Sequence, residues 1–256
     1  MLGAIAGDII GSVYEHHNVR STDFPLFSPD STFTDDTVLT CAVAEMILYG
    51  GDYAEKYRTF YGHYPDRGYG GSFRLWARGR RDEPYNSFGN GSAMRVSPIG
   101  YMYDDRAMVL DEAMQSAEVT HNHPEGIKGA QAVAAAVFMA REGRTKSEIR
   151  DYVMQRFGYD LSGSVQDLRE HYTYDVTCQG TVPQAMMVFL ASKDYEDAIR
   201  KAISIGGDSD TIACITGGIA EAHYGGVPDE IAREALDRLD DRLRCVVLEF
   251  REAYHL

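Results

Sequence analysis

The chain has 256 residues, of which 44% are hydrophobic and 25% charged, and its formal net charge is −14 at pH 7. These proportions are ordinary for a globular protein with a sizeable core, whereas the negative charge and the lack of any Lys/Arg run disfavour a nucleic-acid partner. No apolar stretch approaches the roughly 20 residues that span a bilayer, so we expect no membrane partner.

The cysteines and the first residues favour a cytoplasmic location. The cysteines lie far apart, at positions 41, 178, 214 and 245, and form no Cys-x-x-Cys motif. Cysteines scattered in this way are typical of small buried apolar side chains in a reducing compartment. Residues 1–8 lack the positively charged start of a signal peptide. We therefore expect a cytoplasmic protein, and we expect it to be a monomer.

Apolar residues recur at helical spacing along most of the chain. In chain order, the predicted helices cover residues 2–14, 36–49, 52–62, 72–79, 105–119, 125–142, 146–156, 180–192, 194–204, 211–223 and 228–254, the last as one helix or two. The segment 36–49 is apolar on almost every side, which predicts a buried central helix. Pro183 is compatible with the helix at 180–192 because it falls in the first turn.

Loops are predicted at residues 18–33, 63–71, 80–92 and 157–178. Strand-like alternation is nearly absent, and residues 173–177 are the best candidate, although a weak one. No change of composition, Ser/Pro linker or internal repeat marks a domain boundary. We therefore predict one all-α domain over residues 1–256, with its functional loops between helices.

Two acidic segments carry the strongest chemical signal. Residues 34–37 read Thr-Asp-Asp-Thr, residues 206–211 read Gly-Gly-Asp-Ser-Asp-Thr, and each segment opens an apolar helical run. Taken singly, each is typical of an ordinary helix start, with a capping side chain and acids that suit the helix dipole. Adjacent residues point about 100° apart around a helix, so neighbouring carboxylates can converge only at a helix start.

If the fold brings the two helix starts together, four carboxylates meet in one place. Like charges about 4–6 Å apart repel strongly or force protonation, and divalent cations that prefer oxygen ligands relieve the repulsion. Two Asp at positions i and i+2 after two glycines suit ligation better than capping. The coincidence of the two segments therefore predicts a metal centre, and four carboxylates balance the charge of two divalent ions.

Two other classes of helical metal enzyme have signatures that this chain lacks. Prenyl-chain synthases need Asp-Asp-x-x-Asp, but residues 35–39 read Asp-Asp-Thr-Val-Leu. Phosphohydrolases of the His-Asp type need a His-Asp dipeptide, which does not occur in the sequence. A zinc site is disfavoured because no His/Cys set has ligand spacing.

Further segments could contribute to a site. Glu15 follows the first helical run and is either a solvated helix-end acid or a base beside the metals. Residues 65–72 and 87–95 are Gly-rich turns that enter helices, and such turns offer backbone N–H groups to an anion. The second turn carries Phe88, an aromatic that could stack on a base. His121 lies at a helix junction, where a structural role is the commoner one.

Taken in this order, the segments resemble the ADP-ribosylglycohydrolase family, which includes the dinitrogenase reductase-activating glycohydrolases. The resemblance runs from Gly3 to about Gly226. It rests on Gly-Asp-x-x-Gly at 7–11 with Glu15, and on residues 34–37, 67–70, 89–95, 120–121 and 206–211. The resemblance implies an all-α orthogonal helical bundle with a dinuclear Mg²⁺ or Mn²⁺ site between helix N-termini.

By position, the resemblance also assigns site residues. The residues that match metal ligands are Thr34, Asp35, Asp36, Asp208, Asp210 and Thr211. The residues that match substrate contacts are Gly68, Gly70, Gly71, Ser87, Phe88, Gly89, Asn90 and His121. Within this second set, the turns match phosphate-contacting loops, Phe88 matches an aromatic on adenine, and His121 matches a ribose or phosphate contact. Some members carry an acid implicated in catalysis where this chain has Ser87.

The reaction implied is metal-dependent hydrolysis of the glycosidic bond between ADP-ribose and an acceptor, through an oxocarbenium-like transition state. We expect Glu15 to orient or deprotonate the water, with Asp36 and Asp208 as further catalytic acids. Arginine side chains of proteins are the first expected acceptor. The alternatives are a serine, nucleobase or O-acetyl-ADP-ribose linkage, or a metal-dependent nucleotide phosphohydrolase. A non-catalytic relative would have lost ligands, but every candidate metal position carries a side-chain oxygen.

Overall fold

The structure is a computed structural model that describes residues 1–80 and 83–256. Within these residues it is all-α, as the sequence predicts, and contains no strand. The helices are α1 Leu2–Gly11, α2 Asp35–Tyr49, α3 Tyr53–His63, α4 Gly71–Ala77, α5 Gly91–Met94, α6 Ile99–Met102, α7 Arg106–Glu118, α8 Pro124–Arg141, α9 Lys146–Phe157, α10 Val165–His171, α11 Cys178–Ala191, α12 Tyr195–Ser204, α13 Ser209–Tyr224, α14 Asp229–Asp237 and α15 Asp241–Ala253.

Several element boundaries differ from the prediction. The first helix, α1, ends at Gly11 rather than at residue 14, whereas the last segment forms two helices, α14 and α15, one of the two arrangements predicted for it. The loop predicted at 157–178 contains α10, which has no buried residue and therefore no apolar stripe for the sequence to reveal. The weak strand candidate at 173–177 forms no strand; of these residues only Thr177 forms an isolated bridge, to Gly89. The short helices α5 and α6, of four residues each, were not predicted.

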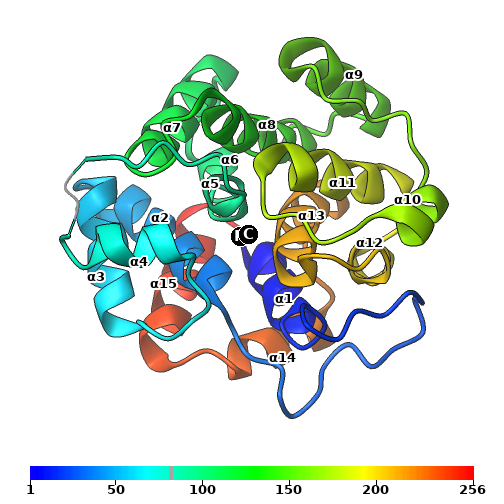
Figure 1. Cartoon of the computed structure of the whole chain (residues 1–256), viewed down its shortest axis with the longest axis horizontal. Helices are drawn as coiled ribbons and strands as arrows, with labels where there is room; N and C mark the ends of the chain where they lie inside the picture. Colours follow the sequence, from blue (N-terminus) through cyan, green and yellow to red (C-terminus); the bar gives the residue numbers. More distant parts are fainter. Residues whose placement is uncertain (81–82) are drawn as a thin grey trace.

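Helices α1 and α13 form the centre of the molecule and lie side by side (Figure 1). Glycines allow their backbones to touch. A Cβ atom at Gly7 would lie 2.2 Å from the carbonyl oxygen of Ala213, a distance too short for any side chain to be accommodated. At the end of α1, a Cβ atom at Gly11 would lie 2.5 Å from the Cα atom of Asp210. This contact brings the acidic start of α13 directly against α1.

The helix predicted to be buried at 36–49 is buried over residues 36–44, and its last turns are half-buried or exposed. It packs against α3 and α15. Its start faces the middle of the molecule, where α1 and α13 also meet. The charged residue Asp36 is therefore placed in the interior by the same packing that buries the apolar residues after it.

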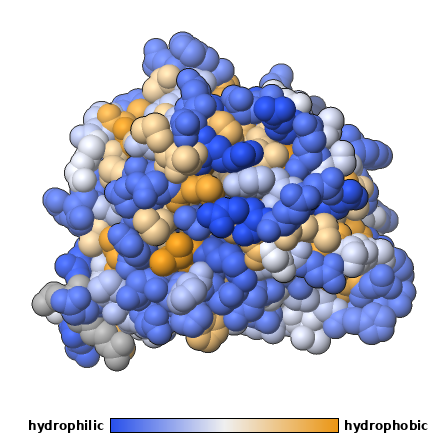
Figure 2. All heavy atoms as spheres, turned by 90° about the horizontal axis from the view of Figure 1, so that it is seen from above, coloured by the Kyte–Doolittle hydropathy of each residue, from blue (hydrophilic) through white to orange (hydrophobic). Residues whose placement is uncertain are grey.

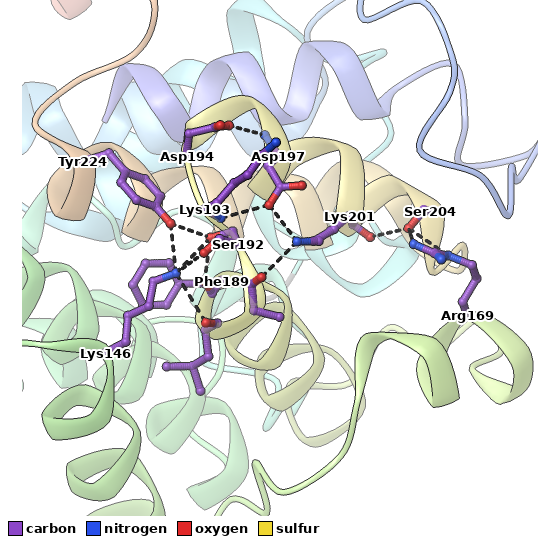
Figure 3. Close-up of polar contacts among 12 residues, drawn as sticks. Lys146, Arg169, Phe189, Ser192, Lys193, Asp194, Asp197, Lys201, Ser204 and Tyr224 are labelled. Carbon is purple, nitrogen blue, oxygen red and sulfur yellow. Dashed lines mark hydrogen bonds and ion pairs between the residues drawn. The ribbon is translucent and has the colours of Figure 1, made fainter.

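Lys146 ties three helices together on one side of the bundle (Figure 3). Its Nζ atom donates to the carbonyl oxygen of Leu190 at 3.3 Å and to the hydroxyl of Tyr224 at 2.8 Å. A further bond at 3.3 Å reaches the hydroxyl of Ser192, the C-cap residue of α11. The cation thus satisfies free acceptors at the carboxyl end of α11, where a positive charge also suits the helix dipole.

The surface in Figure 2 is mostly hydrophilic, with apolar residues in small scattered groups. Among the described residues, no helix is both long enough and apolar enough to cross a membrane.

Candidate active site

The starts of α2 and α13 converge, as the two acidic segments predict. Thr34 is the N-cap of α2, and its hydroxyl accepts the backbone N–H of Asp36 at 3.3 Å. Asp208 occupies the corresponding position of α13. The hydroxyl of Thr211 donates to Oδ2 of Asp36 at 3.3 Å, which joins segments that are 175 residues apart in the chain.

The structure adds a carboxylate that the sequence did not assign to the site. Carboxylate oxygens of Asp8, Asp36 and Asp210 all lie within 4.8 Å of one another. Asp8 is fully buried on α1, where Oδ1 accepts the hydroxyl of Thr34 at 2.7 Å and Oδ2 accepts the N–H of Thr37 at 3.1 Å. A charged residue inside an otherwise apolar helical run is the signal that could have singled out Asp8.

A second group of carboxylates lies beside the first. Oxygens of Glu15, Asp208 and Asp210 also lie within 4.8 Å of one another, so Asp210 belongs to both groups. Two overlapping sets of this kind could hold two cations that share one ligand. Among the described residues, no group of acidic, His and Cys side chains outside this centre meets the same criterion.

The residues present fit divalent cations that prefer oxygen. Asp36 is buried, and its Oδ1 atom has no hydrogen-bond partner. A buried acceptor without a partner is costly, and a cation at this point would satisfy it. Side chains of both groups offer oxygen atoms only, which suits Mg²⁺, Mn²⁺ or Ca²⁺ rather than zinc.

The electrostatics of the protein alone also point to a missing positive charge. Burial, and then the neighbouring charges of Asp8, Asp35 and Asp208, raise the pKa of Asp36 well above its usual value. Burial, and then the charges of Asp208 and Asp36, raise the pKa of Asp210 in the same way. Carboxylates in such a cluster either keep protons or bind cations.

Asp208 and Asp35 differ in their surroundings from Asp36 and Asp210. Burial raises the pKa of Asp208, but Nδ2 of Asn90 donates to its Oδ2 at 2.7 Å and favours the charged form. Asp35 belongs to neither carboxylate group and faces the Gly-rich turn, with Oδ1 3.0 Å from where a Cβ atom of Gly68 would lie. Its assignment as a metal ligand stays a prediction.

Asn18 joins the two loops that carry the outer carboxylates. Its Nδ2 atom donates to the carbonyl oxygens of Glu15 at 3.0 Å and Gly207 at 3.1 Å, and its Oδ1 atom accepts the N–H of Gly207 at 2.8 Å. Gly207 has a φ of 78°, and a Cβ atom there would lie 2.4 Å from the ring of Tyr172. Only glycine fits, so the Gly-Gly pair is required for Asp208 to stand opposite Glu15.

The carboxylate groups open into a cavity of about 360 Å³. It is lined by Glu15, Thr34, Asp35, Asp36, Leu39, Gly68, Gly70, Gly71, Ser72, Phe73, Tyr85, Ser87, Gly89, Asn90, Gly91, Met94, Arg95, His121, Tyr174, Val176, Asp208, Asp210 and Thr211. Every residue that the sequence assigned to the site is among them except Phe88. Tyr85, Arg95, Tyr174 and Val176 had not been assigned; Arg95 ends the Gly-rich segment 89–95, whereas no local motif marks the other three.

Phe88 lies outside the lining of the cavity. Its side chain is 43% exposed, and its ring packs 5.2 Å from the ring of His123. The backbone on either side is held in place, because the N–H of Asn90 donates to the carbonyl of Val176 at 2.8 Å and the N–H of Cys178 donates to the carbonyl of Phe88 at 2.9 Å. A contact between Phe88 and adenine would need the ligand to extend past the rim, and stays a prediction.

Comparisons with known proteins agree with this geometry. A family model described as ADP-ribosylglycohydrolase matches residues 1–255. The chain is 29% identical to the ADP-ribosylhydrolase ARH3 of Homo sapiens, over 88% of this chain and 84% of that protein. It is 27% identical to a putative ADP-ribosyl glycohydrolase, L543, of Acanthamoeba polyphaga mimivirus, over 88% of this chain and 85% of that protein.

A solved structure titled ADP-ribosylglycohydrolase-related protein complex has the same fold. It superposes with a TM-score of 0.71 and 23% sequence identity, over 99% of this chain and 97% of that chain. The family match covers nearly all of the sequence, including both acidic segments and the Gly-rich turns. The chain is therefore an enzyme of the ADP-ribosylglycohydrolase family.

Proposed function

We propose that the protein hydrolyses the glycosidic bond between ADP-ribose and an acceptor, with two divalent cations, Mg²⁺ or Mn²⁺, as cofactors. The observation that carries the proposal is the pair of carboxylate groups that share Asp210 and open into the cavity with the Gly-rich turns. A pyrophosphate needs hydrogen-bond donors, and a ribose diol can bind a divalent cation through its hydroxyl oxygens. The cavity offers the Gly-rich turns as donors and the carboxylates that would hold the cations.

The aspartates are proposed to hold the cations and to surround the reacting sugar with negative charge. Asp36 and Asp210 would hold one cation with Asp8, while Asp208 and Asp210 would hold the second. When bound, the cations supply positive charge that offsets the carboxylates and attracts ribose hydroxyls and water. The remaining negative charge of Asp36 and Asp208 favours the positive charge that develops on the sugar ring.

Glu15 is the proposed base that orients and deprotonates the attacking water. The hydroxyl of Tyr174 donates to its Oε1 atom at 3.0 Å, which fixes the carboxylate at the side of the cavity. Its side chain is 24% exposed, so it can reach water, whereas Asp36 and Asp210 are buried. A proton from water would go to the carboxylate of Glu15 as the water oxygen bonds to the anomeric carbon and the bond between this carbon and the acceptor breaks. The acceptor leaves with the electron pair of that bond and takes up a proton in turn.

The proposed acceptor is an arginine side chain of a protein. Glu15 and Asp208 place negative charge on the wall of the cavity, and this charge suits a cationic guanidinium. A hydroxyl-linked acceptor, such as serine or the acetyl group of O-acetyl-ADP-ribose, is the alternative. We also propose a reducing, cytoplasmic location, which the unpaired cysteines of the structure support.

One hydrolysis panel tests these proposals. Arginine-, serine- and nucleobase-linked ADP-ribose, O-acetyl-ADP-ribose and nucleotide phosphoesters are each incubated with Mg²⁺, Mn²⁺ or EDTA. We expect release of ADP-ribose from the arginine linkage with either cation and none with EDTA. Faster cleavage of a hydroxyl linkage would overturn the acceptor alone. Phosphate release without ADP-ribose release, or full activity in EDTA, would overturn the reaction itself.

A further inference from the structure

A buried chain of polar side chains borders the substrate cavity. Arg95 follows α5, and Thr120 and His121 follow α7; the three are 0%, 0% and 5% exposed. Nη2 of Arg95 donates to the carbonyl oxygen of Ser116 at 2.7 Å and to the hydroxyl of Thr120 at 3.0 Å. The hydroxyl of Thr120 lies 2.8 Å from Nδ1 of His121. A cation in the interior is thus connected to an imidazole at the cavity wall.

The neighbours of Thr120 favour one direction for its hydroxyl hydrogen. Arg95 has no acceptor atom, so it must donate to Thr120. Two other acceptors lie near this hydroxyl. The hydroxyl of Tyr85 can donate its own hydrogen to Thr120, and the carbonyl of Ala117, at 3.5 Å, already receives the backbone N–H groups of Thr120 at 3.1 Å and His121 at 2.7 Å. The hydrogen of Thr120 is therefore best placed on the line to Nδ1 of His121, which makes Nδ1 an acceptor.

The surroundings of His121 keep its ring neutral. Burial, and then the positive charge of Arg95, lower the pKa of His121 well below its usual value. A neutral imidazole carries one N–H, and the hydrogen bond at one nitrogen decides where it lies. With Nδ1 as an acceptor, the hydrogen lies on Nε2. The ring of Tyr85 holds this orientation by an edge contact, with centroids 5.8 Å apart.

Nε2 faces the Gly-rich turn on the cavity wall. It lies 3.2 Å from where a Cβ atom of Gly91 would stand and 3.6 Å from the same point at Gly89. Both glycines and His121 line the cavity. An Nε2–H group at this position adds a donor to those of the turn without adding positive charge.

We propose that Arg95 and Thr120 are positioning residues that hold His121 as the Nε2–H tautomer, so that it donates a hydrogen bond to an oxygen atom of the bound nucleotide sugar. The identity of that ligand rests on the proposed function, but the tautomer belongs to the free protein. The partner of Nε2 is a phosphate or ribose oxygen, since a pure donor cannot pair with Nε2–H.

Nitrogen NMR of protein labelled with ¹⁵N-histidine measures the tautomer directly, and His121→Gln assigns the signals. We expect a pyridine-like Nδ1 and a pyrrole-like Nε2 in the wild type and in Thr120→Ser. Thr120→Val, which cannot donate to Nδ1, should lose this single tautomer. A pyrrole-like Nδ1 in the wild type, as would follow if Thr120 donated to the nearby hydroxyl of Tyr85 instead, would overturn the proposal without any variant.

Calorimetric binding of ADP-ribose then tests the consequence. Thr120→Val should weaken binding by about 5- to 10-fold, the usual effect of one hydrogen bond, and Thr120→Ser should restore it. Thr216→Val is the matched control, because Thr216 is also fully buried and donates one bond, to Ala185 at 3.2 Å, which joins α13 to α11 and does not involve His121. Equal weakening in the control, or unchanged binding in Thr120→Val, overturns the role of Thr120. If the wild type failed to bind ADP-ribose, the proposed function would be wrong, whereas the tautomer result would be unaffected.

Discussion

At the scale of single residues, Asp210 has the most consequential position. It is the carboxylate shared by both groups, and its own N-terminal helix position brings it against α1. Asp36 is its counterpart on α2, with one oxygen left without a partner. The site therefore depends on charges that are unfavourable in the protein alone and become favourable with cations.

Asp210→Asn should abolish the metal-dependent activity while leaving the fold intact. The variant removes one ligand from each carboxylate group, so we expect a loss of turnover of more than about 100-fold and no thermal stabilisation by Mg²⁺. Circular dichroism tests whether the fold is intact, and thermal unfolding with and without Mg²⁺ tests the stabilisation by the cation. Asp151→Asn, on the exposed surface of α9, is the control and should behave like the wild type. Wild-type turnover in Asp210→Asn would refute the metal centre.

Glu15→Gln should separate binding from catalysis. Loss of a general base lowers kcat by about 10²- to 10⁴-fold, whereas ADP-ribose should bind with nearly unchanged affinity, because the glutamine keeps the size of the side chain. Tyr174→Phe removes only the hydrogen bond to Oε1 and should lower kcat by a smaller factor. If Mg²⁺ affinity and kcat fall together in Glu15→Gln, Glu15 acts as a cation ligand rather than as a base.

At the scale of elements, the contact between α1 and α13 positions the site. The backbones approach so closely that side chains are excluded at several glycines, and Asp8 and Asp210 are carried into the same place by this approach. Asn18 likewise joins the two loops that carry Glu15 and Asp208. The chemistry thus depends on packing contacts between residues that do not themselves supply a metal ligand.

Gly7→Ala should destabilise the protein, since its Cβ atom would lie 2.2 Å from the carbonyl oxygen of Ala213. We expect a loss of unfolding free energy of about 1–3 kcal/mol or more, together with weaker Mg²⁺ binding. Gly62→Ala is the matched control, because Gly62 lies in α3 with nothing within 4 Å of the added atom. There alanine should stabilise the helix by about 0.5–1 kcal/mol. Urea unfolding measures the unfolding free energy of both variants. If both variants were destabilised, or both stabilised, the packing argument would be contradicted.

At the scale of the whole molecule, the cavity makes stability depend on pH and on metal together. The raised pKa values of Asp36 and Asp210 mean that the metal-free folded protein keeps protons that the unfolded chain releases above about pH 4. The folded state then binds more protons, so the unfolding free energy falls as pH rises, by up to about 1.4 kcal/mol per pH unit for each such group.

Saturating Mg²⁺ should remove this dependence, and the stabilisation by Mg²⁺ should therefore grow as the pH rises above about 4. His121 acts in the opposite direction. Its lowered pKa means that the unfolded chain takes up a proton below about pH 6.5 that the folded protein does not, so stability falls as pH decreases. Urea unfolding in Mg²⁺ or EDTA measures both slopes, with His121→Gln expected to reduce only the second. A flat pH profile in EDTA would show that the carboxylates are not buried together.

Much of the architecture could be predicted from local sequence patterns. The all-α fold and the family are confirmed, and most helices have the predicted positions, because amphipathic periods and helix starts are local properties. The errors fall where the local pattern is weak: α10 has no fully buried residue, α5 and α6 are single turns, and the extended segment before α11 forms a single bridge.

The sequence by itself determined the chemical character of the site: two helix starts rich in aspartate, oxygen-only donors and Gly-rich turns. Only the tertiary structure decided how they combine. Asp8 joins Asp36 and Asp210, Phe88 lies outside the cavity lining, and Arg95 reaches His121 through Thr120. These relations join residues that are distant in the chain, and they depend on which helix faces meet. Close contacts at glycines fix those faces, and no local pattern records the partner of a contact.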